Sequence, residues 1–122
     1  MTSNELKLRT KNFSLRVIRM IEKLPKSNSA KVIGYQLIRS ATSVGANYRA
    51  ACRARTKAEF ISKIKIVEEE SDESLYWLEL IQELQFFKNV LISDLIREAD
   101  ELTAIFTSTV KTAKRNVLKS KM

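Results

Sequence analysis

The chain has 122 residues, with 22 Lys and Arg, 14 Asp and Glu, one Cys and no His, which gives a formal charge of +8. This length fits one small domain, and we expect a single domain over residues 1–122. No apolar run approaches the roughly 18 residues of a membrane span, and the start of the chain is polar. We therefore predict a cytoplasmic protein with no membrane contact.

The missing residue types exclude much catalytic chemistry. Without His, the commonest general base and the imidazole metal ligands are absent, and the lone Cys52 makes neither an intrachain disulfide nor a zinc knuckle. Gly34 and Gly45 stand too far apart to build a phosphate-binding loop. We expect no enzyme, no catalytic residue, no bound metal and no cofactor.

Four long helices are predicted from the spacing of apolar residues. The whole chain has two Gly and one Pro, too few for the turns of a sheet protein. Apolar residues instead recur every three to four positions over about 4–24, 29–54, 56–88 and 93–117. Short connections make sequence neighbours antiparallel, so we predict an all-α fold, an up-down-up-down four-helix bundle.

Capping signals mark the expected helix ends. Pro25 closes the first helix, because proline disfavours helix at the preceding residue. The second helix is capped by Ser27 or Ser29, and its many small residues predict close packing around its middle. Thr56 begins the third helix in a capping box with Glu59, three residues later. The fourth helix is expected to start with Ser93 as its N-cap.

The second half of the third helix, Leu75 to Phe87, is apolar on almost every side. A helix in a monomeric bundle needs only one buried face, so the surplus predicts a second partner, either the end of another helix or another subunit. On this basis we expect a homo-oligomer.

Charge is strongly segregated along the chain. Residues 1–67 carry a net charge of +12, residues 68–101 carry −9 and residues 102–122 carry +5. Such segregation serves either to bind a polyanion or to join complementary surfaces of neighbouring subunits. Exposed lysines such as Lys7, Lys11, Lys23 and Lys31 often only solvate a helix surface, and that alternative stays open here.

The densest basic cluster lies where the second helix meets the third. Its cations would contact phosphates and release counterions, with little reading of bases. Two alternatives remain open for its members: Arg53 turned inward against the acidic cluster, and Arg49 at a subunit seam. The candidate nucleic-acid-binding residues are Arg49, Arg53, Arg55, Lys57 and Lys63.

The acidic cluster at residues 68–73 lacks the His partners of a bundle di-iron site, so we predict no metal there. A carboxylate at a helix seam needs a paired cation. We expect Glu70 or Glu73 to meet Arg39, Arg49 or Arg53 between the second and third helices. Aromatic residues are expected to anchor the core or an interface. The predicted structural and interface residues are Arg39, Asn47, Tyr48, Glu70, Glu73 and Trp77.

The stretch QLIRSATSVGANYRA at residues 36–50 resembles the signature of four-helix bundle proteins related to the 23S rRNA-intervening sequence protein. Residues 52–55, 59–60, 63 and 69–80 fit one branch of that family, and the likeness covers about residues 10–110. Many members follow the Asn with Ile-Ala-Glu-Gly, whereas Asn47 is followed here by Tyr48, Arg49, Ala50 and Ala51. No role of that Glu carries over to this chain.

The resemblance implies a bacterial cytoplasmic bundle protein that assembles as a ring-like homopentamer with a positive surface suited to nucleic acid. Some similar proteins are accessory proteins of diversity-generating retroelements, which partner a reverse transcriptase and nucleic acid. Others are encoded inside insertions of large-subunit ribosomal RNA genes. Two functions remain open: a scaffold associated with RNA or DNA, and a protein-protein interaction module whose charge serves self-assembly or a partner protein.

Overall fold

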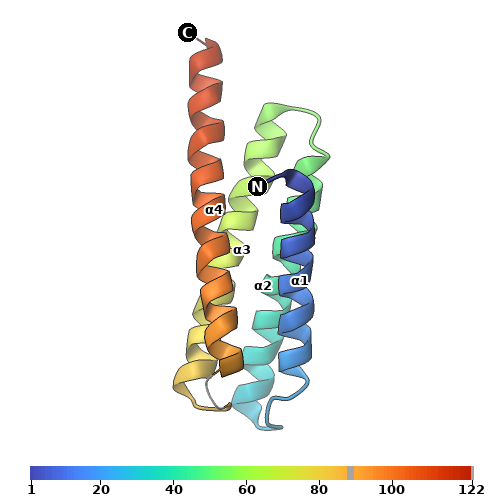
Figure 1. Ribbon diagram of the computed structural model, residues 1–122, viewed down its shortest axis with the longest axis vertical. Helices are drawn as coiled ribbons and strands as arrows, with labels where there is room; N and C mark the ends of the chain where they lie inside the picture. The colour runs from blue at the N-terminus through green and yellow to red at the C-terminus, as the bar shows by residue number, and fades with distance from the viewer. Residues whose placement is uncertain (88–89, 122) are drawn as a thin grey trace.

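Four helices make up the part of the chain described by the computed structural model, residues 1–87 and 90–121. They are α1 (Ser3–Ile21), α2 (Asn28–Cys52), α3 (Lys57–Glu83) and α4 (Val90–Lys121). Each helix runs antiparallel to the next, as Figure 1 shows, which confirms the predicted all-α up-down-up-down bundle. None of these described helices is long and apolar enough to cross a membrane.

Three side-chain caps fix the starts of the first three helices. Thr2 accepts a hydrogen bond from the Glu5 N–H at 3.1 Å and begins α1. Ser27 begins α2, so the first of the two expected serines is the cap. Thr56 begins α3 by accepting from the Glu59 N–H at 3.0 Å, as predicted. The Glu59 carboxylate accepts in return from the Arg55 N–H at 3.2 Å, so two otherwise orphaned donors are satisfied.

Other helix ends differ from the prediction. The backbone tightens after Ile21, where the N–H groups of Lys23 and Leu24 reach back only three residues, so α1 ends before the expected residue 24. Helix α3 ends at Glu83 because Gln85 adopts a positive φ of 57°. Its expected end at Lys88 lies outside the described residues.

The last helix is longer at both ends than expected. Because α4 begins at Val90, Ser93 lies inside the helix, and its prediction as the N-cap was wrong. The helix also continues past the expected residue 117 to Lys121. Lysine and arginine in a last turn complement the negative end of the helix dipole, which favours this continuation.

The core is formed by one apolar stripe from each helix. Phe13 and Met20 come from α1, Leu37 from α2, Leu78 from α3 and Phe106 from α4, and all five are at most 1% exposed. Burying a large apolar side chain contributes about 1.5–3 kcal/mol. These stripes follow the helical period of the sequence, so the predicted core faces are correct.

Small residues in the middle of α2 allow close helix packing, as predicted. A Cβ placed on Gly45 would lie 3.5 Å from the backbone of Thr10, so α1 and α2 nearly touch there. The Ser14 hydroxyl donates to the Ala41 carbonyl at 2.9 Å. The residue before Ala41, Ser40, accepts a hydrogen bond from the Ser74 hydroxyl of α3 at 3.0 Å. Close packing along α2 fixes the positions of both neighbouring helices.

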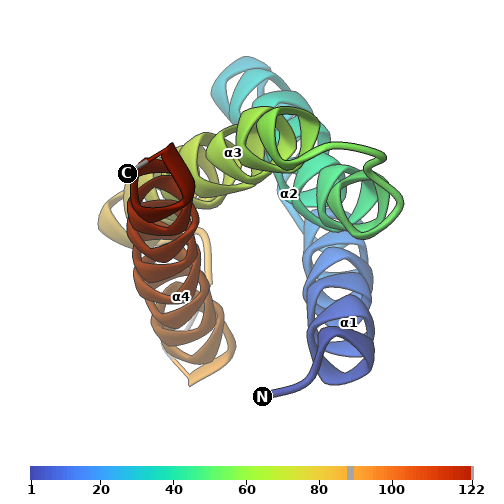
Figure 2. The ribbon, with the colours of Figure 1, turned by 90° about the horizontal axis from the view of Figure 1, so that it is seen from above.

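The side of the bundle between α1 and α4 is the least closed. Seen from above in Figure 2, α1 to α4 follow one another around an arc whose ends are α1 and α4. Contacts between these two helices are far fewer than between sequence neighbours. Few groups therefore hold α1 to α4.

Most of the apolar surplus between Leu75 and Phe87 is covered by the chain itself. Phe86 and Phe87 lie beyond the end of α3, and both pack half-buried against the core. Leu75 and Trp77, which lie within α3, are also half-buried against the core. Two side chains of this stretch, Tyr76 and Leu84, remain 54% and 49% exposed. Contacts within the bundle core therefore account for most of the surplus, for which the end of another helix or another subunit was expected.

Candidate nucleic-acid interface

Four basic segments meet at one end of the bundle. The topology brings the start of α1, the end of α2, the start of α3 and the end of α4 to the same end (Figure 1). The end of α2 and the start of α3 are continuous in sequence, so the four segments comprise residues 1–11, 45–67 and 105–121. Together they carry fourteen Lys and Arg against two Glu. We call them the basic end. The remaining described residues carry seven basic and twelve acidic side chains, so the molecule is electrically polarised along its length.

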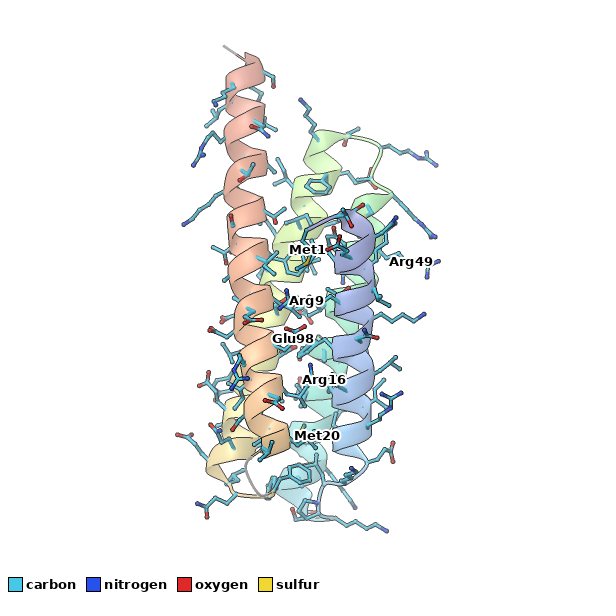
Figure 3. All side chains as sticks on the ribbon, in the orientation of Figure 1. Met1, Arg9, Arg16, Met20, Arg49 and Glu98 are labelled. Atoms are coloured by element: carbon cyan, nitrogen blue, oxygen red, sulfur yellow. The ribbon has the colours of Figure 1, made fainter. Side chains whose placement is uncertain are left out.

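The fold divides the predicted basic cluster between two grooves. Arg49 and Arg53 are exposed and line an open groove of about 630 Å³ between α1 and α2. Arg55 and Lys57 are exposed and line a second groove of about 440 Å³, where the α2–α3 turn faces α4. Arg53 therefore does not turn inward to Glu70, which was an open alternative. Figure 3 shows Arg49 pointing away from the bundle.

The α1–α2 groove contains two lysines that were not among the predicted nucleic-acid-binding residues. Lys7 and Lys11 of α1 line it together with Arg49 and Arg53 of α2, and no carboxylate lines it. The one-turn spacing of Lys7 and Lys11 was a signal that they share a face. Their partners on α2 are more than 35 residues away in sequence, so only the α1–α2 packing joins the two pairs. The groove also contains Leu8 and Leu15, which are 60% and 37% exposed.

The second groove has an apolar floor and a basic rim. Phe60 and Ile61 of α3 face Ala113 and Val117 of α4 across it. Beyond this floor, α4 carries a run of cations that the sequence analysis did not assign to the site. These cations are Lys111, Lys114, Arg115, Lys119 and Lys121.

Lys63 lies apart from the other predicted nucleic-acid-binding residues. It is half-buried on α3 and lines neither of the two grooves. The helical period explains the difference, because Lys63 is nearly two turns along α3 from Lys57.

Arg39 meets both of its expected carboxylates across the α2–α3 seam. Its guanidinium donates to Glu73 at 2.7 Å and lies 3.7 Å from Glu70. The Arg39 side chain is 46% exposed, so the ion pair is partly solvated and contributes about 1 kcal/mol or less. Glu70 is better shielded, and burial followed by the charge of Glu73 raises its pKa, whereas Arg39 acts in the opposite direction.

Of the remaining predicted structural residues, Trp77 contacts the Arg39–Glu73 ion pair, whereas Asn47 and Tyr48 lie elsewhere. Trp77 lies beside this ion pair and donates its indole N–H to Glu73 at 3.3 Å. Asn47 donates to the Ser43 carbonyl and hydroxyl, one turn earlier in α2. Tyr48 is 5% exposed and packs on Phe106 with ring centroids 5.3 Å apart, so it belongs to the core of this bundle. Its burial, and a hydrogen bond with Cys52, raise the pKa of the Tyr48 phenol.

One polar link between α1 and α4 was missed by sequence reasoning. Arg9 donates to both carboxylate oxygens of Glu98, at 2.6 and 2.8 Å, and to Glu101 at 2.6 Å. Figure 3 shows Arg9 and Glu98 pointing toward one another between the two helices. The only feature of the sequence that indicated this link was the spacing of Glu98 and Glu101, which are three residues apart and therefore share a helix face.

No group of three or more His, Cys, Asp or Glu side chains that could hold a metal ion occurs among the described residues. The polar atoms at the basic end are mainly hydrogen-bond donors of Lys and Arg. Such donors bind anions, and the planar guanidinium of Arg binds phosphate and carboxylate groups through paired hydrogen bonds.

Comparisons with known proteins agree on the kind of bundle. A family model described as 23S rRNA-intervening sequence protein matches residues 3–108. A solved structure of a protein with unknown function from the S23 ribosomal protein family of Bacteroides thetaiotaomicron VPI-5482 is also similar, with a TM-score of 0.79 and 30% sequence identity. That match covers 86% of this chain and 97% of the other. No curated protein matches.

Proposed function

The chain belongs to the 23S rRNA-intervening sequence protein family, and from this premise we propose that it is a non-enzymatic, cytoplasmic scaffold that binds RNA or DNA through its basic end. One observation carries the proposal: four segments distant in sequence converge to place fourteen cations and two carboxylates at one end of the bundle. A polyanion neutralises such a surface and releases its own condensed counterions.

Self-assembly is the second part of the proposal. A few phosphate contacts give weak non-specific affinity, typically ~10⁻⁴ to 10⁻⁶ M at physiological salt. Several copies bound to one nucleic acid raise the effective concentration of each further contact. We therefore include a homo-oligomer, with a pentameric ring as the favoured form, and a reverse transcriptase as a possible protein partner in a retroelement context. Exposed Tyr76 and Leu84 are available for contact between copies.

The direct test measures binding of RNA and DNA, both single-stranded and duplex, by the intact protein at two salt concentrations. The variant Arg55→Glu with Lys57→Glu reverses two exposed charges at the basic end. Its matched control, Lys23→Glu with Lys26→Glu, reverses two exposed charges at the opposite end. We expect binding to weaken with salt, the first variant to lose about tenfold in affinity and the control to bind like the parent.

Two results would reject this function. The first is no binding of any of the four nucleic acids at low salt. The second is equal loss in the two charge-reversed variants, because net charge alone would then explain the affinity. Helicity and mass in solution must first be the same for all three proteins, so that a folding defect is not read as a binding defect.

A specific observation favours a second candidate, a protein-protein interaction module. The α1–α2 groove combines four cations with two exposed leucines, Leu8 and Leu15. The charged backbone of a nucleic acid has no apolar surface that would cover these leucines. An acidic helix with apolar residues on one face matches this groove. Salt-sensitive binding to a protein partner, lost in Leu8→Ser and retained in Leu118→Ser, would support the module. Leu118 is an exposed leucine outside this groove.

A further inference from the structure

The end of α4 leaves the core of the bundle. Val110, at 6% exposed, is the last buried residue of the helix. Beyond it only Ala113 and Val117 are half-buried, and both line the groove beside the α2–α3 turn. Figure 1 shows this part of α4 extending past the turn. We call residues 111–121 the arm. The family-model match ends at residue 108, before the arm begins.

The arm carries five cations and no carboxylate. Lys111 and Arg115 are one helical turn apart, and so are Arg115 and Lys119. Like charges at this spacing destabilise a helix. No ion pair within the described residues involves the arm, so its repulsion is not relieved from inside the bundle. A bound polyanion would relieve it.

The apolar groove separates two sets of cations. Arg55 and Lys57 line one wall, and the arm forms the opposite wall with Ala113, Asn116 and Val117. The cations of the arm stand on the same helix but do not line the groove itself. With a rise of 1.5 Å per residue, the arm extends its cations along about 15 Å. Two separate sets of cations suit a ligand with two phosphate backbones. A single strand has only one phosphate backbone, so one set of cations is enough to bind it.

Aromatic side chains at the basic end do not offer a stacking platform. Single-stranded nucleic acid is usually held by bases stacked on exposed aromatic rings. Among the described residues of the basic end, Tyr48 and Phe106 are buried and Phe60 is half-buried. The exposed tyrosines, Tyr35 and Tyr76, lie in the other half of the bundle. Single strands therefore gain phosphate contacts here but no stacking.

From these observations we propose that the ligand of the basic end is double-stranded nucleic acid, and that the arm and the α2–α3 turn hold its two phosphate backbones. This inference rests on the function proposed above and narrows it to one ligand class. Recognition is by backbone and shape, because no side-chain hydrogen bond within the described residues fixes the exposed arginines of the two grooves in a geometry for reading bases.

The test uses the full-length protein with fluorescent RNA and DNA duplexes of one sequence and with their separate strands, over a series of salt concentrations. We expect the duplexes to bind at least tenfold more tightly than the single strands. Neutralising three arm cations, in Lys114→Gln, Arg115→Gln and Lys119→Gln, removes up to three phosphate contacts. The magnitude of the slope of log affinity against log salt should then fall by up to about 2.7 for the DNA duplex, at about 0.9 per contact.

The matched control neutralises Lys23, Lys26 and Lys31, three exposed lysines in the other half of the bundle. It should keep the slope of the parent. Single strands that bind as tightly as duplexes would overturn this inference while leaving the proposed function intact. So would an unchanged slope in the arm variant, or displacement of the duplex by polyglutamate as efficiently as by unlabelled duplex. Failure of all nucleic acids to bind would instead remove the proposed function itself.

Discussion

Arg9 of α1 and Glu98 of α4 form a two-pronged ion pair between the first and the last helix of the bundle. The guanidinium donates from Nε and Nη2 to the two carboxylate oxygens at 2.8 and 2.6 Å. Both side chains are shielded, at 23% and 15% exposed, and this hydrogen bond raises the pKa of Arg9 above its already high value. The pair lies across the least closed side of the bundle, where few other contacts join the two helices.

Replacing Arg9 with Ala should destabilise the protein by about 2 kcal/mol, between the values for exposed and fully buried pairs. Glu98 would remain shielded without its cation, and Glu101 would lose the same partner. Chemical denaturation followed by circular dichroism measures the change. The control is Arg97→Ala, which removes an exposed i,i+3 pair with Asp94 and should cost a few tenths of a kcal/mol. Equal losses of unfolding free energy in the two variants would show that the Arg9–Glu98 pair stabilises the protein no more than an exposed ion pair does.

Glu70 should make stability depend on pH. Burial is the main cause that raises its pKa, so the folded state disfavours the charged form. Below the ordinary carboxyl pKa of about 4.3 the group is protonated in both states and costs nothing. As the pH rises through the raised pKa, the folded protein must ionise Glu70 and loses stability. Glu70→Gln should therefore be more stable than the parent at neutral pH, with a gain that vanishes in acid.

Unfolding free energies of the parent and the Glu70→Gln variant across this pH range give the test. Glu69→Gln serves as the matched control, because Glu69 is the preceding residue of α3 and is exposed. Its stability difference from the parent should stay near zero at every pH. A Glu70→Gln protein that is less stable than the parent at neutral pH would show that the attraction of Arg39 outweighs the cost of burial.

Gly45→Ala should stabilise the protein by about 0.5–1 kcal/mol, because glycine inside a helix is unfavourable relative to alanine. The new methyl group would lie 3.5 Å from the Thr10 backbone, an ordinary contact distance. Gly34→Ala should gain less, since its methyl group would lie 3.0 Å from a Leu24 methyl group that must move. Thermal unfolding of the two variants gives the comparison. A loss of stability in Gly45→Ala would mean that α1 and α2 leave no room for one methyl group.

The sequence by itself determined the helices and which face of each is buried. These features depend on residues three or four positions apart, so a local pattern contains them. Thr56 with Glu59 specified the start of α3, and an apolar stripe that includes Phe106 and Val110 specified the buried face of α4.

Two helix ends were misplaced although each had a local signal. Helix α1 ends at Ile21, before the end expected from Pro25, and α4 begins at Val90, before Ser93. A capping residue only favours a helix end, and tertiary contacts override it.

Tertiary structure alone decided which distant charges stand together. Lys7 and Arg53 line one groove, whereas Arg53 and Arg55, two residues apart, line different grooves because the chain turns between α2 and α3. The Arg9–Glu98 pair joins residues 89 positions apart. Surface charges impose no period on a sequence, since a cation on an exposed helix face is tolerated with or without a partner. Their grouping therefore follows only from the antiparallel packing of the helices, which brings the basic segments to one end of the bundle.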